Sequence, residues 1–250
     1  MKKIKVDAVI FDYGNTIVHE PLLDVLKIRM DELQKILKKS GYEFRDKEII
    51  GSWIEADNSV NYPHITHFFQ ELSIVNKFLK ILGVKKSDMP RLSKGLLRIY
   101  REGYRALYKS NPRRKEIKKV LDNLKKKGIR LAVFSDGRRL DLRPALKLYG
   151  VLKYFEFVLT SEEIGIEKPS PLVFRALLKK MREPAKNVVH VGDNPVKDIQ
   201  GAKRVGMKAI LYLPPQKYRR SVNWRNYKTK INVRPDAVIR KFSDLEKILV

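Results

Sequence analysis

Short runs of apolar residues alternate with segments of helical periodicity over much of the chain. Each run is nearly continuous in apolar character, which is expected of a strand covered on both faces. Strands that alternate with helices predict an α/β fold with a doubly wound, Rossmann-like parallel sheet. The predicted strands are 6–11, 129–134, 155–160, 188–191 and 209–213.

Glycines mark the ends of three predicted helices in this part of the chain. The helical patterns cover 115–127, 140–149 and 196–205. A glycine follows each of them and suits the left-handed residue that closes a helix. Ser170-Pro171 opens a further helix, with serine as the cap and proline in the first turn. Residues 214–235 are interpreted as a long loop before a terminal strand and helix.

One long interval, 18–111, interrupts the alternation because it contains helical periodicity and no convincing strand. About four helices fit a small bundle inserted after the first strand. Asn111-Pro112 is a plausible hinge where the chain re-enters the sheet. We therefore predict a sheet domain of residues 1–17 and 112–250 and an inserted all-α domain of 18–111. The predicted helices of the insertion are 22–39, 46–57, 65–82 and 89–108.

The charge of the chain is its unusual global property: 54 basic residues stand against 28 acidic ones, a net charge of +26. Such an excess attracts phosphates, whether of nucleic acid, lipid headgroups or a small metabolite. The alternative is a solvated lysine coat, for instance in a thermophilic organism. The absence of cysteine fits heat adaptation, but glutamate is not enriched as it usually is in such proteins.

Composition also excludes several classes of protein. Without cysteine the chain has no disulfide, no thiolate metal site and no cysteine nucleophile. No stretch approaches 18 uncharged apolar residues, which excludes a membrane span. The apolar run behind Met1 is too short for a signal peptide, so we expect a cytoplasmic protein.

Polar residues that can perform chemistry follow four of the predicted strands. Ligands of an open parallel sheet bind at the carboxyl ends of its strands, so we expect these residues to converge on one edge. They are Asp12 and Thr16 after the first strand, Ser135 and Asp136 after the second, Lys168 beyond the third, and Asp193 and Asp198 after the fourth.

These residues suit phosphoryl transfer. An ionised carboxylate such as Asp12 can attack phosphorus and form an aspartyl phosphate. Asp193 and Asp198 offer oxygen ligands for Mg²⁺. Lys168 would pair with the nucleophile and the transferring oxygens, while hydroxyl groups and loop amides hold the phosphoryl group. Taken singly, each residue is more often a turn, cap or surface residue. The evidence for phosphoryl transfer is that all of them occur together, each after a successive predicted strand.

The set resembles the haloacid dehalogenase superfamily, chiefly its phosphatases with a helical cap inserted after the first strand. The match is most specific where Gly192-Asp193 and Asp198 form Gly-Asp-x4-Asp, followed by Gly201-Ala202. The resemblance implies a Mg²⁺-dependent phosphatase of small phosphorylated metabolites, with 18–111 as its cap. It implies Asp12 as nucleophile and metal ligand, the carbonyl of Gly14 and Asp193 as metal ligands, and Asp198 as a ligand or an orienter of metal-bound water. It implies that Thr16, Ser135, Asp136 and Lys168 bind phosphate.

One position departs from the family pattern. Its phosphatases usually carry a second aspartate two residues after the nucleophile, as general acid and base, where this chain has Gly14. Positioned proton transfer contributes ~10²–10⁴ in rate. The chain is therefore expected to be a slow phosphatase, to recruit another group such as His19, or to perform different chemistry. Asn15 also stands where glycine is usual.

Two other branches of the family also lack that aspartate. The dehalogenases usually have tyrosine there, whereas Tyr13 lies one residue earlier, and they lack the metal-binding Gly-Asp-x4-Asp form. This makes dehalogenation the less favoured reaction. The phosphonatases need a cap lysine that cannot be singled out among the many lysines here.

Substrate selection would fall to the cap. The candidate substrate contacts are Trp53, Tyr62, Arg101 and Arg105. Helical spacing places the two arginines on one face with Tyr108, suited to an anionic substrate group. The alternative interpretation is that the arginines form a solvated stripe on the helix and that the aromatic residues belong to the core.

A different class of function is nucleic-acid binding on a catalytically impaired scaffold. Residues 217–230 mix aromatic and basic side chains, as do surfaces that stack bases and track the backbone. The run 109–130 has ten basic residues against two acidic ones. Such runs are usually solvated faces, and no recognised nucleic-acid motif is present. The sequence indicates no oligomeric state.

Overall fold

A computed structural model describes residues 3–18, 22–59, 71–136, 139–213 and 233–250. The chain divides into two compact units. The core unit combines Met1–Glu20 with Asn111–Val250, and the cap unit is Pro21–Ser110. The boundaries predicted from the sequence differ from these by one to three residues.

The core unit is built on a six-stranded, all-parallel sheet with the order β3-β2-β1-β4-β5-β6. The chain runs outward from β1 to β2 and β3, then crosses to the other side of β1 for β4, β5 and β6. The switch point of the topology therefore lies between β1 and β4, where a ligand crevice is expected. The strands are Ala8–Phe11, Arg130–Ser135, Phe157–Thr160, Val188–Gly192, Lys208–Tyr212 and Ala237–Ile239.

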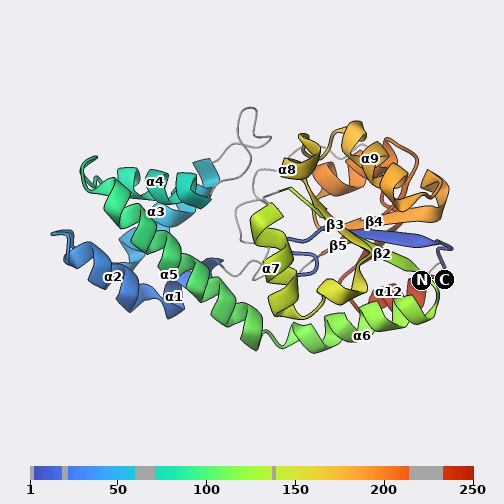
Figure 1. Cartoon of the computed structure of the whole chain (residues 1–250), viewed down its shortest axis with the longest axis horizontal. Coiled ribbons are helices and arrows are strands. Elements are labelled where there is room, and N and C mark those ends of the chain that lie inside the picture. The colour runs from blue at the N-terminus through green and yellow to red at the C-terminus, as the bar shows by residue number, and fades with distance from the viewer. Residues whose placement is uncertain (1–2, 19–21, 60–70, 137–138, 214–232) are drawn as a thin grey trace. The chain divides into compact units, whose positions relative to one another are not determined.

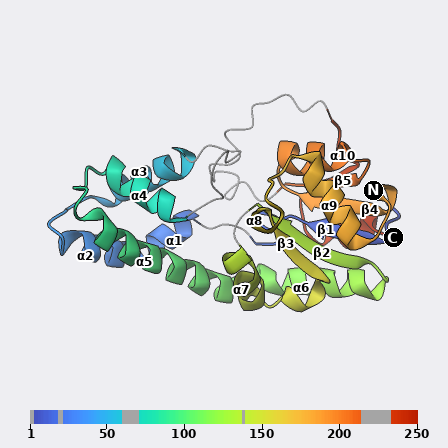
Figure 2. The same cartoon turned by 45° about the horizontal axis from the view of Figure 1, so that its top comes forward.

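Helices cover both faces of this sheet (Figures 1 and 2). Strand alternation sends Ala8 and Ile10 of β1 into a core with Phe174 of α9. Phe11 of β1 packs against Phe242 at 5.6 Å between ring centroids, on the side of α6 and α12. The helices of the core unit are α6 (Arg113–Lys126), α7 (Arg139–Tyr149), α8 (Ser161–Ile164), α9 (Pro171–Met181), α10 (Gly201–Lys203) and α12 (Asp244–Ile248).

The predicted helix ends are confirmed at three glycines: Gly128, Gly150 and Gly206 have φ angles of 79°, 79° and 82°. Ser170 caps α9 as expected, because its side chain accepts a hydrogen bond from the amide of Leu172. The terminal strand and helix predicted after residue 235 are β6 and α12.

The predicted helix 196–205 is wrong as a single α-helix. A π-helical segment, Pro195–Gln200, comes first and is followed by the short α10. Asn194 caps the segment, since its side-chain oxygen accepts hydrogen bonds from the amides of Val196 and Lys197. Such wide turns are rare and often occur at functional sites.

The cap unit is entirely helical in its described part: α1 (Leu22–Ile28), α2 (Met30–Lys38), α3 (Asp46–Ser59), α4 (Glu71–Ile81) and α5 (Met89–Ser110). The helix predicted over 22–39 is two helices, because Arg29 leaves the helical conformation at φ −115° and ψ 10°. Within the described ranges, none of the helices is both long and apolar enough to cross a bilayer.

Trp53 lies at the centre of the cap unit. Its side chain is 1% exposed and packs on Phe78 and Tyr100, with ring centroids 4.6 and 5.2 Å away. Trp53 was a candidate substrate contact, and its burial gives it a packing role instead. The sequence could not separate the two roles, because an aromatic residue at helical spacing fits both.

We expect Trp53→Ala to lower the free energy of unfolding of the cap unit by about 3–5 kcal/mol, because it removes a large buried side chain and leaves a cavity. Urea unfolding followed by circular dichroism measures the change. Ile28→Ala is the matched control: this side chain is 51% exposed, and the change should stay within about 0.5 kcal/mol. Equal stability of Trp53→Ala and the wild type would contradict the packing role.

Candidate active site

Asp12 follows the last residue of β1. It is held there by the neighbouring strand β4 and by two side chains. Its amide donates to the carbonyl of Val191 at 2.8 Å, which continues the pairing of β1 with β4. Lys168 Nζ lies 2.6 Å from Oδ1, and Thr16 Oγ1 donates to Oδ2 at 3.3 Å. The side chain of Asp12 is buried. A carboxylate fixed at both oxygens at a strand end is suited to act as a nucleophile.

The loop after Asp12 is closed by its own backbone. The amides of Ile17 and Val18 donate to the carbonyl of Tyr13. Asn15 has a φ of 53°, in the left-handed region where asparagine is among the tolerated residues. This explains how asparagine replaces the usual glycine here. Gly14, two residues after Asp12, is half-buried and brings no side chain to the site.

Lys168 is shared between two carboxylates. Its Nζ lies 2.6 Å from Asp12 Oδ1 and 2.7 Å from Asp198 Oδ1, and its side chain is 2% exposed. Burial alone would lower the pKa of Lys168, but the charges of Asp12, Asp198 and Asp136 raise it well above the ordinary value. The ammonium group is therefore charged at neutral pH. It links Lys168 to Asp12, which lies 156 residues away in sequence, and to Asp198, which lies 30 residues away.

Asp136 supports Lys168 rather than offering its own side chain to a ligand. Its Oδ1 accepts a hydrogen bond from the Lys168 amide at 3.1 Å, and its Oδ2 lies 3.4 Å from Lys197 Nζ. The carboxylate of Asp136 is therefore engaged within the protein, which leaves its backbone amide as the group suited to contact a phosphate. Ser135 is the half-buried last residue of β2, next to Asp136.

Asp198 is held by three hydrogen bonds. Oδ1 contacts Lys168 Nζ at 2.7 Å and His190 Nε2 at 3.0 Å, and Oδ2 accepts from the Asn194 amide at 2.9 Å. Burial would raise the pKa of Asp198, but the Lys168 charge and the His190 hydrogen bond lower it below the ordinary value. Gly192 permits this approach, because a Cβ there would lie 2.2 Å from the carboxyl carbon of Asp198.

Three acidic residues of this cluster could together hold a metal ion. One oxygen each of Asp12, Asp193 and Asp198 lies within 4.8 Å of the others, and all three residues are buried. Burial raises the pKa of Asp12 to about 6, despite the attraction of Lys168. The three carboxylates bring oxygen ligands together at one place, and a divalent ion bound there would reduce their mutual repulsion. The donor set therefore fits Mg²⁺, which prefers few carboxylates and keeps several waters.

The oxygens of Asp198 are already largely occupied, whereas those of Asp12 are each engaged once. A carboxylate has about four acceptor positions, and three of them are used in Asp198. Of the two alternatives from the sequence, orienting metal-bound water therefore suits Asp198 better than direct ligation. By the same count Asp12 has more acceptor positions left for a direct metal contact.

Sequence reasoning missed His190, Asn194 and Lys197 at this site. His190 is a polar residue inside a predicted buried strand, which was a signal for a supporting role. The asparagine cap of the π-helical segment and the pairing of Lys197 with Asp136 depend on an unusual turn that no periodicity indicates.

The remaining predicted residues either belong to the cap unit or lie outside the described residues. Arg101 and Arg105 lie on α5 of the cap unit, half-buried and exposed respectively, and their contact with substrate stays a prediction. Tyr62, His19 and the basic stretch 217–230 lie outside the described residues.

The basic run 109–130 is partly used within the protein. Arg130 pairs with Glu156 and Glu183, and Lys126 pairs with Asp122. Arg113, Arg114 and Lys127 donate to Tyr212 Oη and to backbone carbonyls. At least half of its ten cations therefore have an intramolecular role.

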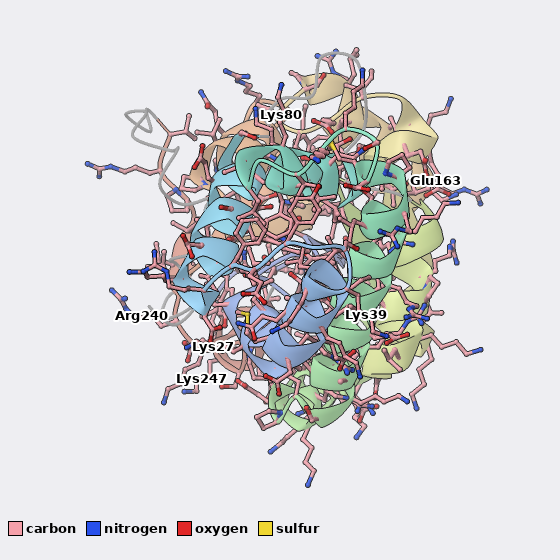
Figure 3. All side chains as sticks on the ribbon, turned by 90° about the vertical axis from the view of Figure 1, so that its left-hand side faces the viewer. Lys27, Lys39, Lys80, Glu163, Arg240 and Lys247 are labelled. Carbon is pink, nitrogen blue, oxygen red and sulfur yellow. The ribbon has the colours of Figure 1, made fainter. Side chains whose placement is uncertain are left out.

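The exposed lysines of the cap unit are spread over its surface. Lys27, Lys39 and Lys80 lie well apart in Figure 3.

Comparisons with known proteins agree with this geometry. A family model of haloacid dehalogenase-like hydrolases matches residues 6–206. The glyceraldehyde 3-phosphate phosphatase of Methanocaldococcus jannaschii is 30% identical over 185 residues, which cover 68% of this chain and 77% of that protein.

Solved structures are similar over nearly the whole chain. A HAD hydrolase of Bacillus subtilis, bound to magnesium, aligns with a TM-score of 0.67 at 16% identity, covering 99% of this chain and 98% of that one. A 2-haloacid dehalogenase of Pseudomonas syringae aligns with a TM-score of 0.58 at 22% identity, covering 99% and 97%. At such identities these likenesses show the fold alone. The family match over residues 6–206 shows that the chain belongs to the haloacid dehalogenase-like hydrolases.

Proposed function

We propose that the protein is a Mg²⁺-dependent phosphatase of small phosphorylated metabolites that works through an aspartyl-phosphate intermediate on Asp12. The observation that carries the proposal is the buried Asp12 carboxylate, held by Lys168 and Thr16 beside Asp193 and Asp198. The likeness to a glyceraldehyde 3-phosphate phosphatase supports a small phosphorylated substrate.

The proposed first step is an attack of one Asp12 carboxylate oxygen on the phosphorus of a monoester. The P–O bond to the substrate breaks, and the leaving oxygen takes up a proton to become an alcohol. Water then attacks the phosphorus of the acyl phosphate, which releases inorganic phosphate and restores the carboxylate. Gly14 supplies no proton in either step, so water or another side chain transfers it.

Charge compensation makes an attack by an anion on an anion feasible. Asp12, Asp193 and the Gly14 carbonyl would hold Mg²⁺, which supplies charge neutralisation for the phosphoryl oxygens. Lys168 adds a fixed positive charge at the nucleophile, with the hydroxyls of Thr16 and Ser135 and the amide of Asp136 as further donors to phosphate. Arg101 and Arg105 of the cap would bind the remainder of the substrate.

The acidic cluster favours phosphoryl transfer over dehalogenation. Attack on carbon has no need of a divalent ion, so a dehalogenase gains nothing from three buried carboxylates within 4.8 Å. Burying such a group of like charges without a function is costly.

We expect Asp12→Asn to lower the turnover of p-nitrophenyl phosphate in the presence of Mg²⁺ on the order of 10³-fold or more, because an amide does not attack phosphorus. Release of p-nitrophenol measures it. Asp24→Asn makes the same chemical change at an exposed position of α1 and should leave turnover unchanged. Wild-type turnover in Asp12→Asn would remove Asp12 as the nucleophile.

Gly14→Asp should raise phosphatase turnover by about 10²-fold, because it places a proton-transfer group two residues after the nucleophile. The control is Gly14→Asn, which has nearly the same shape and cannot transfer the proton. A gain in both variants, or in neither with the fold retained by circular dichroism, would place proton transfer elsewhere.

Magnesium should stabilise the protein, and more so at about pH 7.5 than at about pH 5. At ~100 times its dissociation constant, a ligand of the folded state adds ~2.7 kcal/mol. With the Asp12 pKa raised to about 6, a proton competes with the ion at the lower pH. In the metal-free protein this group contributes stability below its unfolded pKa, and that contribution is lost as the pH rises through about 6.

Thermal unfolding with and without MgCl₂ at the two pH values measures this effect. Asp193→Asn should abolish the increase in Tm, while Asp24→Asn should keep it. An increase of equal size at both pH values, or one that persists in Asp193→Asn, would contradict the assigned metal site.

A further inference from the structure

His190 is a fully buried polar side chain in the middle of the sheet. It lies in β4 beside Ile10 and Ala209 of the neighbouring strands, with 0% of its surface exposed. Its ring meets the ring of Phe174 edge-on at 5.3 Å between centroids. Nε2 lies 3.0 Å from Asp198 Oδ1. An apolar side chain would fill this position at no cost in polar burial, so the imidazole calls for an explanation.

The surroundings of the ring determine which ring nitrogen donates a hydrogen bond. Nδ1 is buried and has no hydrogen-bond partner in the part of the chain that the structure describes. Buried N–H groups without an acceptor are rare because they are costly. Nε2 therefore carries a proton, which it donates to Asp198 Oδ1 at 3.0 Å.

This donor completes a chain of four buried side chains. His190 contacts Asp198, Asp198 contacts Lys168 at 2.7 Å, and Lys168 contacts Asp12 at 2.6 Å. Together with the Asn194 amide on Oδ2, His190 fixes the rotation of the Asp198 carboxylate about its χ2 angle. Because Asp198 is fixed, the Lys168 ammonium group stays between the two carboxylates. It does not move closer to Asp12 at the expense of its contact with Asp198.

We infer that His190 is a positioning residue for catalysis: its Nε2–H orients Asp198, and through Asp198 it sets the place of the Lys168 ammonium group beside Asp12. The inference rests on the proposed function, because its consequence is measured as turnover. His190 touches neither substrate nor the reacting atoms, so it acts on kcat through Lys168 rather than on substrate binding.

The test compares His190→Leu with His190→Gln. Leucine fills the cavity and removes the donor, so kcat for p-nitrophenyl phosphate should fall roughly 10- to 100-fold with little change in KM, as for other residues that orient a catalytic side chain. The glutamine amide nitrogen can reach the position of Nε2 and should restore most of kcat.

Val189→Ala is the matched control, because it alters a buried side chain of the same strand without touching a polar group. It should lower the Tm through the cavity it leaves and keep the kcat of the folded protein. The NMR shifts of the imidazole nitrogens should show a proton on Nε2.

Each outcome is decisive. Equal kcat in His190→Leu and the wild type, equal loss in the leucine and glutamine variants, or a proton on Nδ1 would overturn the positioning role. A wild-type protein that hydrolyses no phosphomonoester would contradict the proposed function instead, and the nitrogen shifts would still test the orientation of Asp198.

Discussion

The constraint on which the rest of the site depends is the sharing of one buried ammonium group between two carboxylates. Lys168 lies within 2.7 Å of both Asp12 and Asp198, and Asp193 adds a third acid to the cluster. Removing one partner from a buried ion pair typically costs about 3–5 kcal/mol, because the remaining charge is left without compensation. The residues that surround the cluster are explained by this need: Asp136 anchors the Lys168 backbone, and His190 and the Asn194 amide hold Asp198.

The topology of the sheet brings these groups together. β1 and β4 are neighbours in space although about 180 residues separate them in sequence, and their register places Phe11 beside Val191. Asp12 and Asp193 follow these paired ends directly, at the switch point between the two halves of the sheet. The π-helical segment after β4 then returns Asp198 onto Gly192, where only a glycine leaves room. Local backbone geometry and strand order thus produce the acidic cluster jointly.

Much of this arrangement could be predicted from the sequence, because its signals are local. Apolar runs, glycine helix ends and polar residues at strand ends predicted the parallel sheet, the inserted helices and the acidic cluster. What could not be predicted depends on tertiary contacts or on rare backbone forms. The break at Arg29 and the π-helical segment after Asn194 leave the hydrophobic periodicity intact, and the burial of Trp53 depends on how α3, α4 and α5 pack. The pairing of His190 with Asp198 joins a strand to a turn that the sequence presented as an ordinary helix.

The central claim, covalent catalysis by Asp12, is tested most directly by trapping the intermediate. Gly14 offers no group to activate water, so the acyl phosphate should accumulate during turnover of a phosphomonoester with Mg²⁺. Acid quenching followed by mass spectrometry of proteolytic peptides should find one added phosphoryl group on the peptide that contains Asp12, and none in Asp12→Asn. A phosphoryl group on another residue, or steady turnover with Asp12 unmodified at every time of quenching, would contradict the account.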